Sequence, residues 1–143
     1  MLRRALHTSS RLPYPRGAVA CILRSRDRYL LIQRGSPPGV GTWSFAGGKL
    51  ELGERTLAGA AREVFEETGL PAHALRMHPR PVSVSDAIVY GDDGTLDFHY
   101  VIAQTFAWIS DEWVDCIVPG DDAADARFFT EDEIRAMPVR TID

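Results

Sequence analysis

The chain has 143 residues, of which 45% are hydrophobic and 25% charged, and this composition predicts one folded domain with a core. Its net charge of −4 gives no reason to expect a nucleic acid or an anionic membrane as partner. No apolar run approaches the roughly 18 residues that a transmembrane helix needs. Cys21 and Cys116 lie far apart, which disfavours a disulfide framework or a zinc site and predicts two buried thiols.

The amino terminus differs from the rest of the chain. Residues 1–26 contain six arginines, and no acidic residue precedes Asp27. An Arg-rich start with Ser and Thr and no acids resembles a mitochondrial transit peptide, although a short surface arm would have the same composition. We expect a basic arm over residues 1–16 and one domain over residues 17–143. The location would be mitochondrial if the arm is a transit peptide and cytoplasmic otherwise.

Two apolar runs of strand type follow the arm. Residues 17–25 and 28–35 are separated by a polar Arg-Asp-Arg turn, which predicts a β-hairpin. Residues 36–45 contain two prolines and two glycines and are expected to form a loop.

The second half of the chain has further strand patterns. Residues 81–91 and 95–110 are joined by Asp-Asp-Gly, a strong turn signal, and predict two more strands. Residues 126–129 are a short strand candidate. Thr130 with Glu133 three residues later is typical of a capping box that opens a helix.

Between these halves, residues 56–69 have the pattern of an amphipathic helix. Thr56 is a candidate N-cap, and Gly69 is a candidate left-handed residue after the last turn. The face expected to enter the core is formed by Leu57, Ala60, Ala61, Val64 and Thr68.

Three glutamates lie on a neighbouring arc of this helix. Glu63, Glu66 and Glu67 are related by three and four residues, so their carboxylates lie close together and repel one another. A bound cation would remove this repulsion. A solvated acidic face is the alternative, and it is the usual explanation of a charge run.

The residues around the glutamates have a specific spacing. Gly48 is followed after five residues by Glu54, and Glu54 after seven by REVFEETGL, residues 62–70. This arrangement resembles the Nudix box at every specified position, and the preceding strand and glycine-rich loop are similar to that family. Ala46 stands where many members of the family have proline. This departure would affect little beyond the rigidity of the loop.

The resemblance implies a fold, a reaction and a metal. The implied fold is of α+β class, the Nudix fold, an α/β/α sandwich with a mixed, mainly antiparallel sheet. The implied reaction is metal-dependent hydrolysis of a nucleoside diphosphate linked to another moiety. Mg²⁺ or Mn²⁺ is the implied cofactor, because a carboxylate cluster suits such hard ions.

The same resemblance implies a substrate class. The glycine-rich loop, the Phe-His-Tyr-Val strand and residues 120–129 look like the small ADP-ribose pyrophosphatase-like group, which makes AMP and ribose 5-phosphate from ADP-ribose. Two alternatives stay open: a pyrophosphohydrolase of nucleoside triphosphates, including oxidised ones, and a non-catalytic nucleotide-binding module. The module would be expected to lack some box glutamates, and all are present. The expected partner is a small-molecule nucleotide, with no nucleic acid and no membrane.

Metal ligation and catalysis are implied for three glutamates of the box, and metal ligation for Gly47, which directly precedes it. Glu63, Glu66 and Glu67 would be the catalytic ligands, joined by the Gly47 carbonyl, and one glutamate would orient or deprotonate water.

Structural support is implied for three other positions of the box. Arg62 would hold the acidic cluster in place through an ion pair with Glu54, a helix-surface arginine being the alternative, and Gly48 is the third position with a supporting role.

Residues outside the box are weaker candidates. Arg34 matches a position that often meets phosphate in the family, while an exposed charge at a strand end is the alternative. Trp43 and Phe45 could stack on a base or belong to the core. His99 is expected to be structural.

A second acidic segment follows a Pro-Gly turn late in the chain. Asp121 or Asp122 is the candidate for an extra acid near the metal, with a solvated loop as the alternative. A homodimer through the region of Trp108 and Trp113 is compatible with the sequence.

Overall fold

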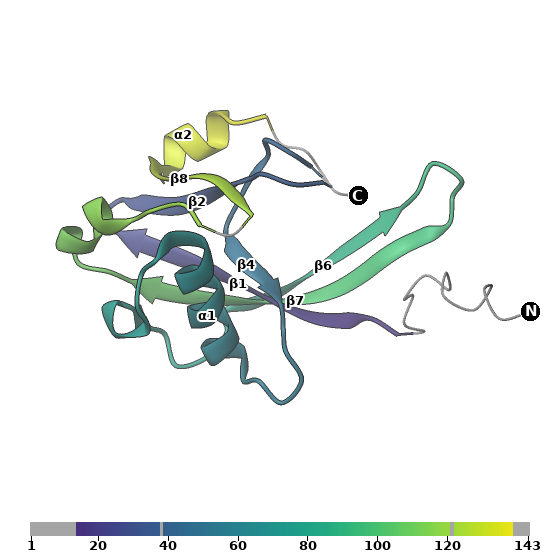
Figure 1. Ribbon diagram of the computed structural model, residues 1–143, viewed down its shortest axis with the longest axis horizontal. Helices are drawn as coiled ribbons and strands as arrows, with labels where there is room; N and C mark the ends of the chain where they lie inside the picture. The colour runs from purple at the N-terminus through teal and green to yellow at the C-terminus, as the bar shows by residue number, and fades with distance from the viewer. Residues whose placement is uncertain (1–13, 38, 121, 139–143) are drawn as a thin grey trace, which may run out of the picture.

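The computed structural model describes residues 14–37, 39–120 and 122–138 (Figure 1). The strands are β1 (Arg16–Ser25), β2 (Arg28–Arg34), β3 (Trp43–Ser44), β4 (Ala46–Lys49), β5 (Arg76–Met77), β6 (Ser83–Tyr90), β7 (Leu96–Trp108) and β8 (Ala123–Thr130). The helices are α1 (Thr56–Thr68) and α2 (Glu131–Ala136), with 3₁₀ turns η1 (Ala72–Ala74) and η2 (Asp111–Cys116). Most of the expected basic arm lies outside the described residues, and β1 begins at Arg16.

The sheet is built around β1, which changes partners along its length. Near its end, β1 pairs with β2 through Arg24–Tyr29 and Ser25–Arg28, so the predicted hairpin is confirmed. Its earlier residues pair antiparallel with β4 and, on the other edge, parallel with β7. The other strand pairs among the described residues are antiparallel. The prediction of a mixed, mainly antiparallel sheet is therefore confirmed.

The core lies between α1 and one face of this sheet. Alternate residues of β1 point toward the helix because side chains of a strand alternate between faces, and Val19, Cys21 and Leu23 are buried there. Ala60 and Val64 of α1 meet them, and both are fully buried. In Figure 1, β8 lies between α1 and α2, so that the two helices form the outer layers of the sandwich and the sheet lies between them. Among the described residues, no helix is both long and apolar enough to cross a membrane.

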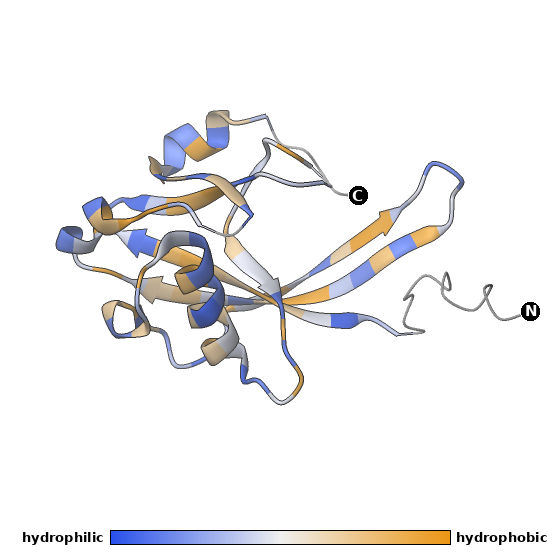
Figure 2. Cartoon of the chain, in the orientation of Figure 1, coloured by the Kyte–Doolittle hydropathy of each residue, from blue (hydrophilic) through white to orange (hydrophobic). Residues whose placement is uncertain are grey.

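The β6–β7 hairpin extends beyond the layers that cover the core (Figure 1). Its Asp-Asp-Gly turn forms as predicted, and the two strands pair from Ser83–Gln104 to Tyr90–Leu96. Val84, Tyr90 and Val101 are exposed on this hairpin, which Figure 2 shows with alternating apolar and polar residues.

The ends of α1 differ in part from the prediction. The helix begins at Thr56, and Arg55 rather than Thr56 is the N-cap, with no side-chain hydrogen bond to the helix. Gly69 ends the helix at φ 75°, so its predicted left-handed conformation is confirmed. Glycine is favoured there because a Cβ would strain this conformation.

The face of α1 that enters the core is also shifted from the prediction. Leu57 and Ala61 are half-buried, whereas Gly59 and the carboxylate-bearing Glu63 are buried. The reason is that α1 packs against β4 as well as β1, which turns the start of the acidic arc inward.

Other differences concern short elements. The expected loop over residues 36–45 contains β3, and the expected strand over residues 126–129 is the longer β8. The capping box of α2 is present with both reciprocal hydrogen bonds between Thr130 and Glu133. Cys21 is buried as expected, but Cys116 is exposed at the end of η2, so the prediction of two buried thiols was wrong for Cys116.

Candidate functional site

Two glycines of β4 let the backbone pass close to β1 and α1. Gly47 pairs with Ala20 of β1, and a Cβ on Gly47 would collide with the Val19 carbonyl oxygen. A Cβ on Gly48 would lie 2.5 Å from Glu63 Oε1. The buried Glu63 carboxylate therefore occupies the space that a side chain at Gly48 would fill, which explains glycine at this position.

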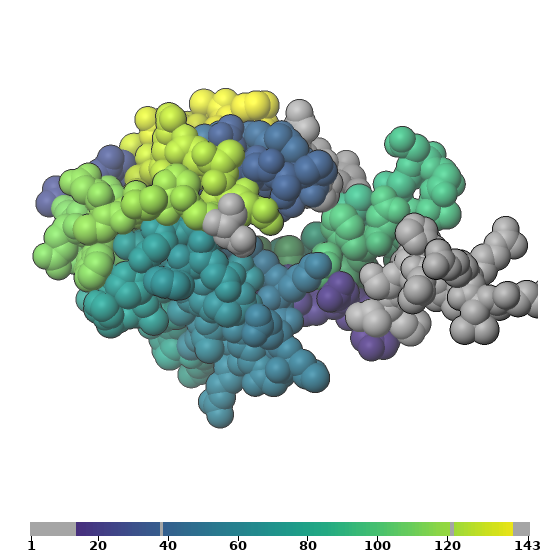
Figure 3. All heavy atoms as spheres, viewed as in Figure 1, coloured from purple at the N-terminus to yellow at the C-terminus, as the bar shows by residue number. Residues whose placement is uncertain are grey.

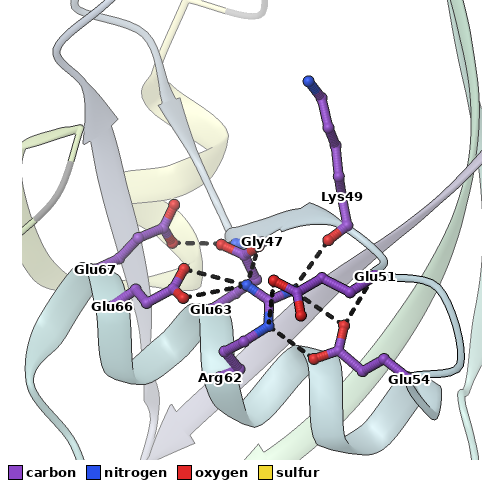
Figure 4. Close-up of polar contacts among 8 residues, drawn as sticks. All are labelled: Gly47, Lys49, Glu51, Glu54, Arg62, Glu63, Glu66 and Glu67. Atoms are coloured by element: carbon purple, nitrogen blue, oxygen red, sulfur yellow. Dashed lines mark hydrogen bonds and ion pairs between the residues drawn. The ribbon is translucent and has the colours of Figure 1, made fainter.

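Arg62 lies at the centre of the acidic residues (Figure 4). Its guanidinium is bidentate with Glu54, through Nε to Oε1 at 2.7 Å and Nη2 to Oε2 at 3.1 Å. Nη1 donates to Glu63 Oε1 at 2.9 Å and to Glu66 Oε2 at 3.2 Å. Nη2 also donates to the Lys49 carbonyl oxygen at 3.0 Å. One cation thus joins the loop before α1 to two glutamates of the helix, and the expected Arg62–Glu54 pair is present.

Charge pairing stabilises the ionised forms of this cluster. The pKa of Glu54 is lowered, first by its hydrogen bond to Arg62 and then by the backbone N–H of Glu51. The pKa of Arg62 is raised, chiefly by its hydrogen bond to Glu54 and also by Glu63 and Glu66. Arg62 is therefore a permanent positive charge that offsets the repulsion among the carboxylates.

Glu67 is held by a different partner. The Gly47 N–H donates to Glu67 Oε2 at 3.1 Å, which ties the last turn of α1 to β4. Glu67 is half-buried and Glu66 is exposed. The three predicted carboxylates therefore lie on the side of α1 that faces β4, where Glu63 and Glu66 share Arg62 and Glu67 binds the Gly47 N–H.

The donor set fits a hard divalent ion by its chemistry, since it consists of carboxylate and backbone carbonyl oxygens. As these side chains lie, no three Asp, Glu, His or Cys residues within the described part of the chain are arranged to hold a metal ion. In this arrangement, Glu63 and Glu66 accept from Arg62 Nη1.

The predicted substrate residues lie on the β2 side. Arg34 is exposed at the end of β2, and its backbone binds the glycine loop twice: the Arg34 N–H donates to Thr42 O, and the Arg34 carbonyl oxygen accepts from the Gly41 N–H. Trp43 packs edge-to-face on Phe129 with ring centroids 5.0 Å apart, which favours the packing alternative. Phe45 is half-buried.

The late acidic segment is described only in part. Asp121 lies outside the described residues. Asp122 has an exposed side chain, and its carbonyl oxygen accepts from the Gly35 N–H at 2.8 Å. His99 is half-buried and lies 3.7 Å from Asp86 across the β6–β7 pair, in keeping with a structural role.

The two tryptophans proposed for dimerisation have partners within the chain. Trp108 contacts Phe106 and Arg76, and Trp113 contacts His73.

Sequence reasoning missed the contact of residues 118–120 with the end of α1. The Val118 and Gly120 N–H groups donate to carbonyls of Thr68 and Glu67. No spacing in the sequence marks this contact, because it joins backbone groups from distant parts of the chain.

Comparison with known proteins gives a family and a fold. Residues 13–142 match the family model described as NUDIX domain. The phosphatase NudJ of Escherichia coli K12 is 36% identical over 67 residues, which cover 45% of this chain and 43% of NudJ. The match thus spans less than half of that relative.

Solved structures of the same fold include complexes with nucleotides. The NUDIX domain of Shewanella oneidensis NrtR, complexed with ADP ribose, has a TM-score of 0.67 at 17% identity, covering 90% of this chain and 80% of that chain. A bifunctional NMN adenylyltransferase/ADP ribose pyrophosphatase from Francisella tularensis, complexed with AMP and a Mn ion, has a TM-score of 0.60 at 23% identity, covering 87% and 37%. At these identities, the likeness shows the fold.

Proposed function

Because the chain belongs to the NUDIX domain family, we propose that it is a metal-dependent pyrophosphohydrolase acting on a nucleoside diphosphate linked to another moiety, with ADP-ribose as the first candidate substrate. The observation that carries this proposal is the acidic side of α1, where Arg62 holds Glu63 and Glu66 beside the Glu67–Gly47 contact. The ADP ribose found with the Shewanella domain supports the choice of substrate.

The proposed metal ligands are Glu63, Glu66, Glu67 and the Gly47 carbonyl, with Mg²⁺ or Mn²⁺ as the ion. When bound, the ion would neutralise diphosphate charge, polarise the attacked phosphorus and lower the pKa of a bound water. The Mn ion in the Francisella structure supports an ion of this class.

Residues of this chain would hold the metal-binding carboxylates in place and accept a proton from the attacking water. Arg62 and the space at Gly48 hold the Glu63 carboxylate, and the Gly47 N–H orients Glu67. One glutamate would take a proton from the attacking water. The water oxygen joins one phosphorus, the bridging P–O bond breaks, and the bridging oxygen leaves with the other phosphate. From ADP-ribose the products are AMP and ribose 5-phosphate, and the proton passes to solvent.

Residues at the end of β2 would bind the rest of the substrate. Arg34 is proposed to contact a phosphate, because its side chain is exposed while its backbone is held on both sides. Phe45 is proposed to meet the base. Trp43 is proposed to contribute through its packing on Phe129, which shapes the same loop. Asp122 is proposed as the extra acid.

A substrate panel tests the reaction. Wild-type protein is incubated with ADP-ribose, NADH, dinucleoside polyphosphates or oxidised dGTP, in Mg²⁺, Mn²⁺ or excess chelator, and the products are separated by chromatography. We expect ADP-ribose to be cleaved to AMP and ribose 5-phosphate, and no turnover in chelator. A preference for triphosphates would overturn the ADP-ribose assignment, and binding without cleavage of any substrate would indicate a nucleotide-binding module.

Two single variants test the site. Glu67→Gln should lower kcat by about 10²-fold or more while leaving the fold intact, because one ligand charge is lost. Glu112→Gln, on the exposed η2 turn, is the matched control and should keep wild-type activity. Equal rates in Glu67→Gln and Glu112→Gln would exclude the proposed site.

A further inference from the structure

Residues 118–120 complete the carboxyl end of α1. Val118 N–H donates to Thr68 O at 3.0 Å, and Gly120 N–H donates to Glu67 O at 3.1 Å. The last carbonyls of a helix have no partner within the helix, so this segment supplies the missing donors. Figure 3 shows the yellow-green segment before β8 packed against α1, in teal. The contact lies at the turn that bears Glu66 and Glu67.

The same segment continues to the end of β2. Asp122 O accepts from the Gly35 N–H at 2.8 Å, and Gly35 directly follows Arg34. We call residues 118–120 together with Asp122 the strap. Gly120 and Asp122 are two residues apart, a separation that spans at most about 7 Å. The strap therefore has one anchor at the glutamate end of α1 and a second anchor, two residues later in the sequence, at the Arg34 end of β2.

Two glycines allow these contacts because they leave space for them. A Cβ on Gly120 would lie 2.8 Å from Glu66 O, and a Cβ on Gly35 would lie 2.7 Å from Asp122 O. Both distances are below those that real Cβ atoms adopt, and the neighbouring atom is backbone in each case. Neither glycine has a positive φ, so the requirement is for space rather than for an unusual backbone conformation.

We propose that Gly120 and Gly35 are positioning residues, and that the strap sets the separation between the metal-binding end of α1 and the phosphate-binding residue Arg34. This inference rests on the proposed function, since it takes Glu66 and Glu67 as metal ligands and Arg34 as a phosphate contact. A methyl group at Gly120 displaces the strap from α1, whereas a methyl group at Gly35 displaces it from β2. The two substitutions therefore disturb different halves of the site.

The test measures metal binding and kinetics separately in the full chain. Gly120→Ala should weaken Mn²⁺ binding, measured by titration calorimetry without nucleotide, by about tenfold. Gly35→Ala should leave Mn²⁺ binding unchanged and raise KM for ADP-ribose by about tenfold, because Arg34 loses its alignment with the phosphate. Its kcat should change little.

Two controls separate positioning from a general loss of stability. Gly91→Ala, at the β6–β7 turn, places a Cβ 3.2 Å from the Asp97 carboxylate and should change neither constant. In the double variant Arg34→Ala/Gly35→Ala, KM should equal that of Arg34→Ala, because Gly35 acts through Arg34. Thermal unfolding of each variant shows that the constants are measured on folded protein.

The possible outcomes test the proposed role of the strap separately from the proposed reaction. The proposal is overturned if Gly120→Ala and Gly35→Ala both keep the wild-type Mn²⁺ affinity and KM. It is also overturned if Gly91→Ala shows the same changes in these constants. Additive effects of Arg34→Ala and Gly35→Ala overturn the role of Gly35. If Gly120→Ala does not fold, the Arg34–Gly35 pair of variants decides alone. If the wild-type chain hydrolyses no nucleotide, the proposed function fails, and Mn²⁺ binding by Gly120→Ala decides the strap: tenfold weakening supports it and an unchanged constant overturns it.

Discussion

Arg62 brings carboxylates together that would repel one another on an isolated helix. Its guanidinium contacts Glu54, Glu63 and Glu66, and its side chain is 24% exposed, so these charge-assisted contacts are partly shielded from water. A lysine could not replace it, because an ammonium group lacks the planar fork that grips Glu54 with two nitrogens. The charge state of Glu54 should therefore affect the stability of the loop before α1.

The first prediction concerns the pH dependence of this contact. The hydrogen bond from Arg62 holds the pKa of Glu54 below its ordinary value in the folded chain, so the pair stabilises the fold above that ordinary pKa. This contribution is lost as the pH falls through the lowered pKa. Glu54→Gln should lower Tm at pH 7, and the difference from wild type should shrink below about pH 4. Asp92→Asn, at an exposed turn, is the control, and a pH-independent difference for Glu54→Gln would contradict the prediction.

The second prediction concerns the two thiols. Burial raises the pKa of Cys21 to about 11, against a hydrogen bond with Thr105 that lowers it, while Cys116 is exposed. Because the thiolate is the reactive form, a thiol reagent at pH 8 should label Cys116 rapidly and Cys21 only after denaturation. Absorbance of the released chromophore measures both phases. A rapid phase that persists in Cys116→Ala would show that Cys21 is accessible.

At the scale of elements, the two ends of α1 are completed in different ways. The first turn has no side-chain cap, because Arg55 occupies the N-cap and an arginine side chain has no hydrogen-bond acceptor. The last turn is closed by Gly69 and by the strap. By contrast, α2 is short and has a complete capping box.

This difference predicts opposite effects of two substitutions. Arg55→Ser should raise the free energy of unfolding by about 1 kcal/mol, because a serine hydroxyl can accept from the first N–H groups of α1. Thr130→Ala should lower it by about 1 kcal/mol through loss of the existing cap on α2. Urea unfolding measures both. No change in Arg55→Ser would mean that water already satisfies those N–H groups fully.

At the scale of the whole molecule, metal binding should stabilise the fold. The proposed ligands come from β4 and α1, which are separated in sequence and meet only in the folded chain. An ion that binds the folded state alone stabilises it by about 2.7 kcal/mol at a concentration 100 times its dissociation constant.

Calorimetry can test this linkage without any substrate. Mn²⁺ should raise Tm in the wild type, and chelator should reverse the shift. Glu66→Gln/Glu67→Gln should show little or no rise, while Glu112→Gln should behave as wild type. An equal rise in all three proteins would place the ion elsewhere.

The sequence by itself determined what depends on short separations along the chain. The spacing of Glu63, Glu66 and Glu67 places them on one arc of a helix, since a helix repeats every 3.6 residues. The Asp-Asp-Gly turn and the Thr130–Glu133 box are likewise local, and both form as predicted. Residues matching a family motif also indicated the fold.

Only the tertiary structure decided which distant groups meet. The parallel pairing of β1 with β7, the Glu63 carboxylate against Gly48, and Gly120 against Glu66 join segments that no local period relates. The same holds for Arg55 in place of Thr56 at the N-cap and for the inward turn of Glu63, because packing against β4 sets where α1 begins and which face is buried. Backbone hydrogen bonds, which any residue except proline can donate, leave no mark in the residue pattern.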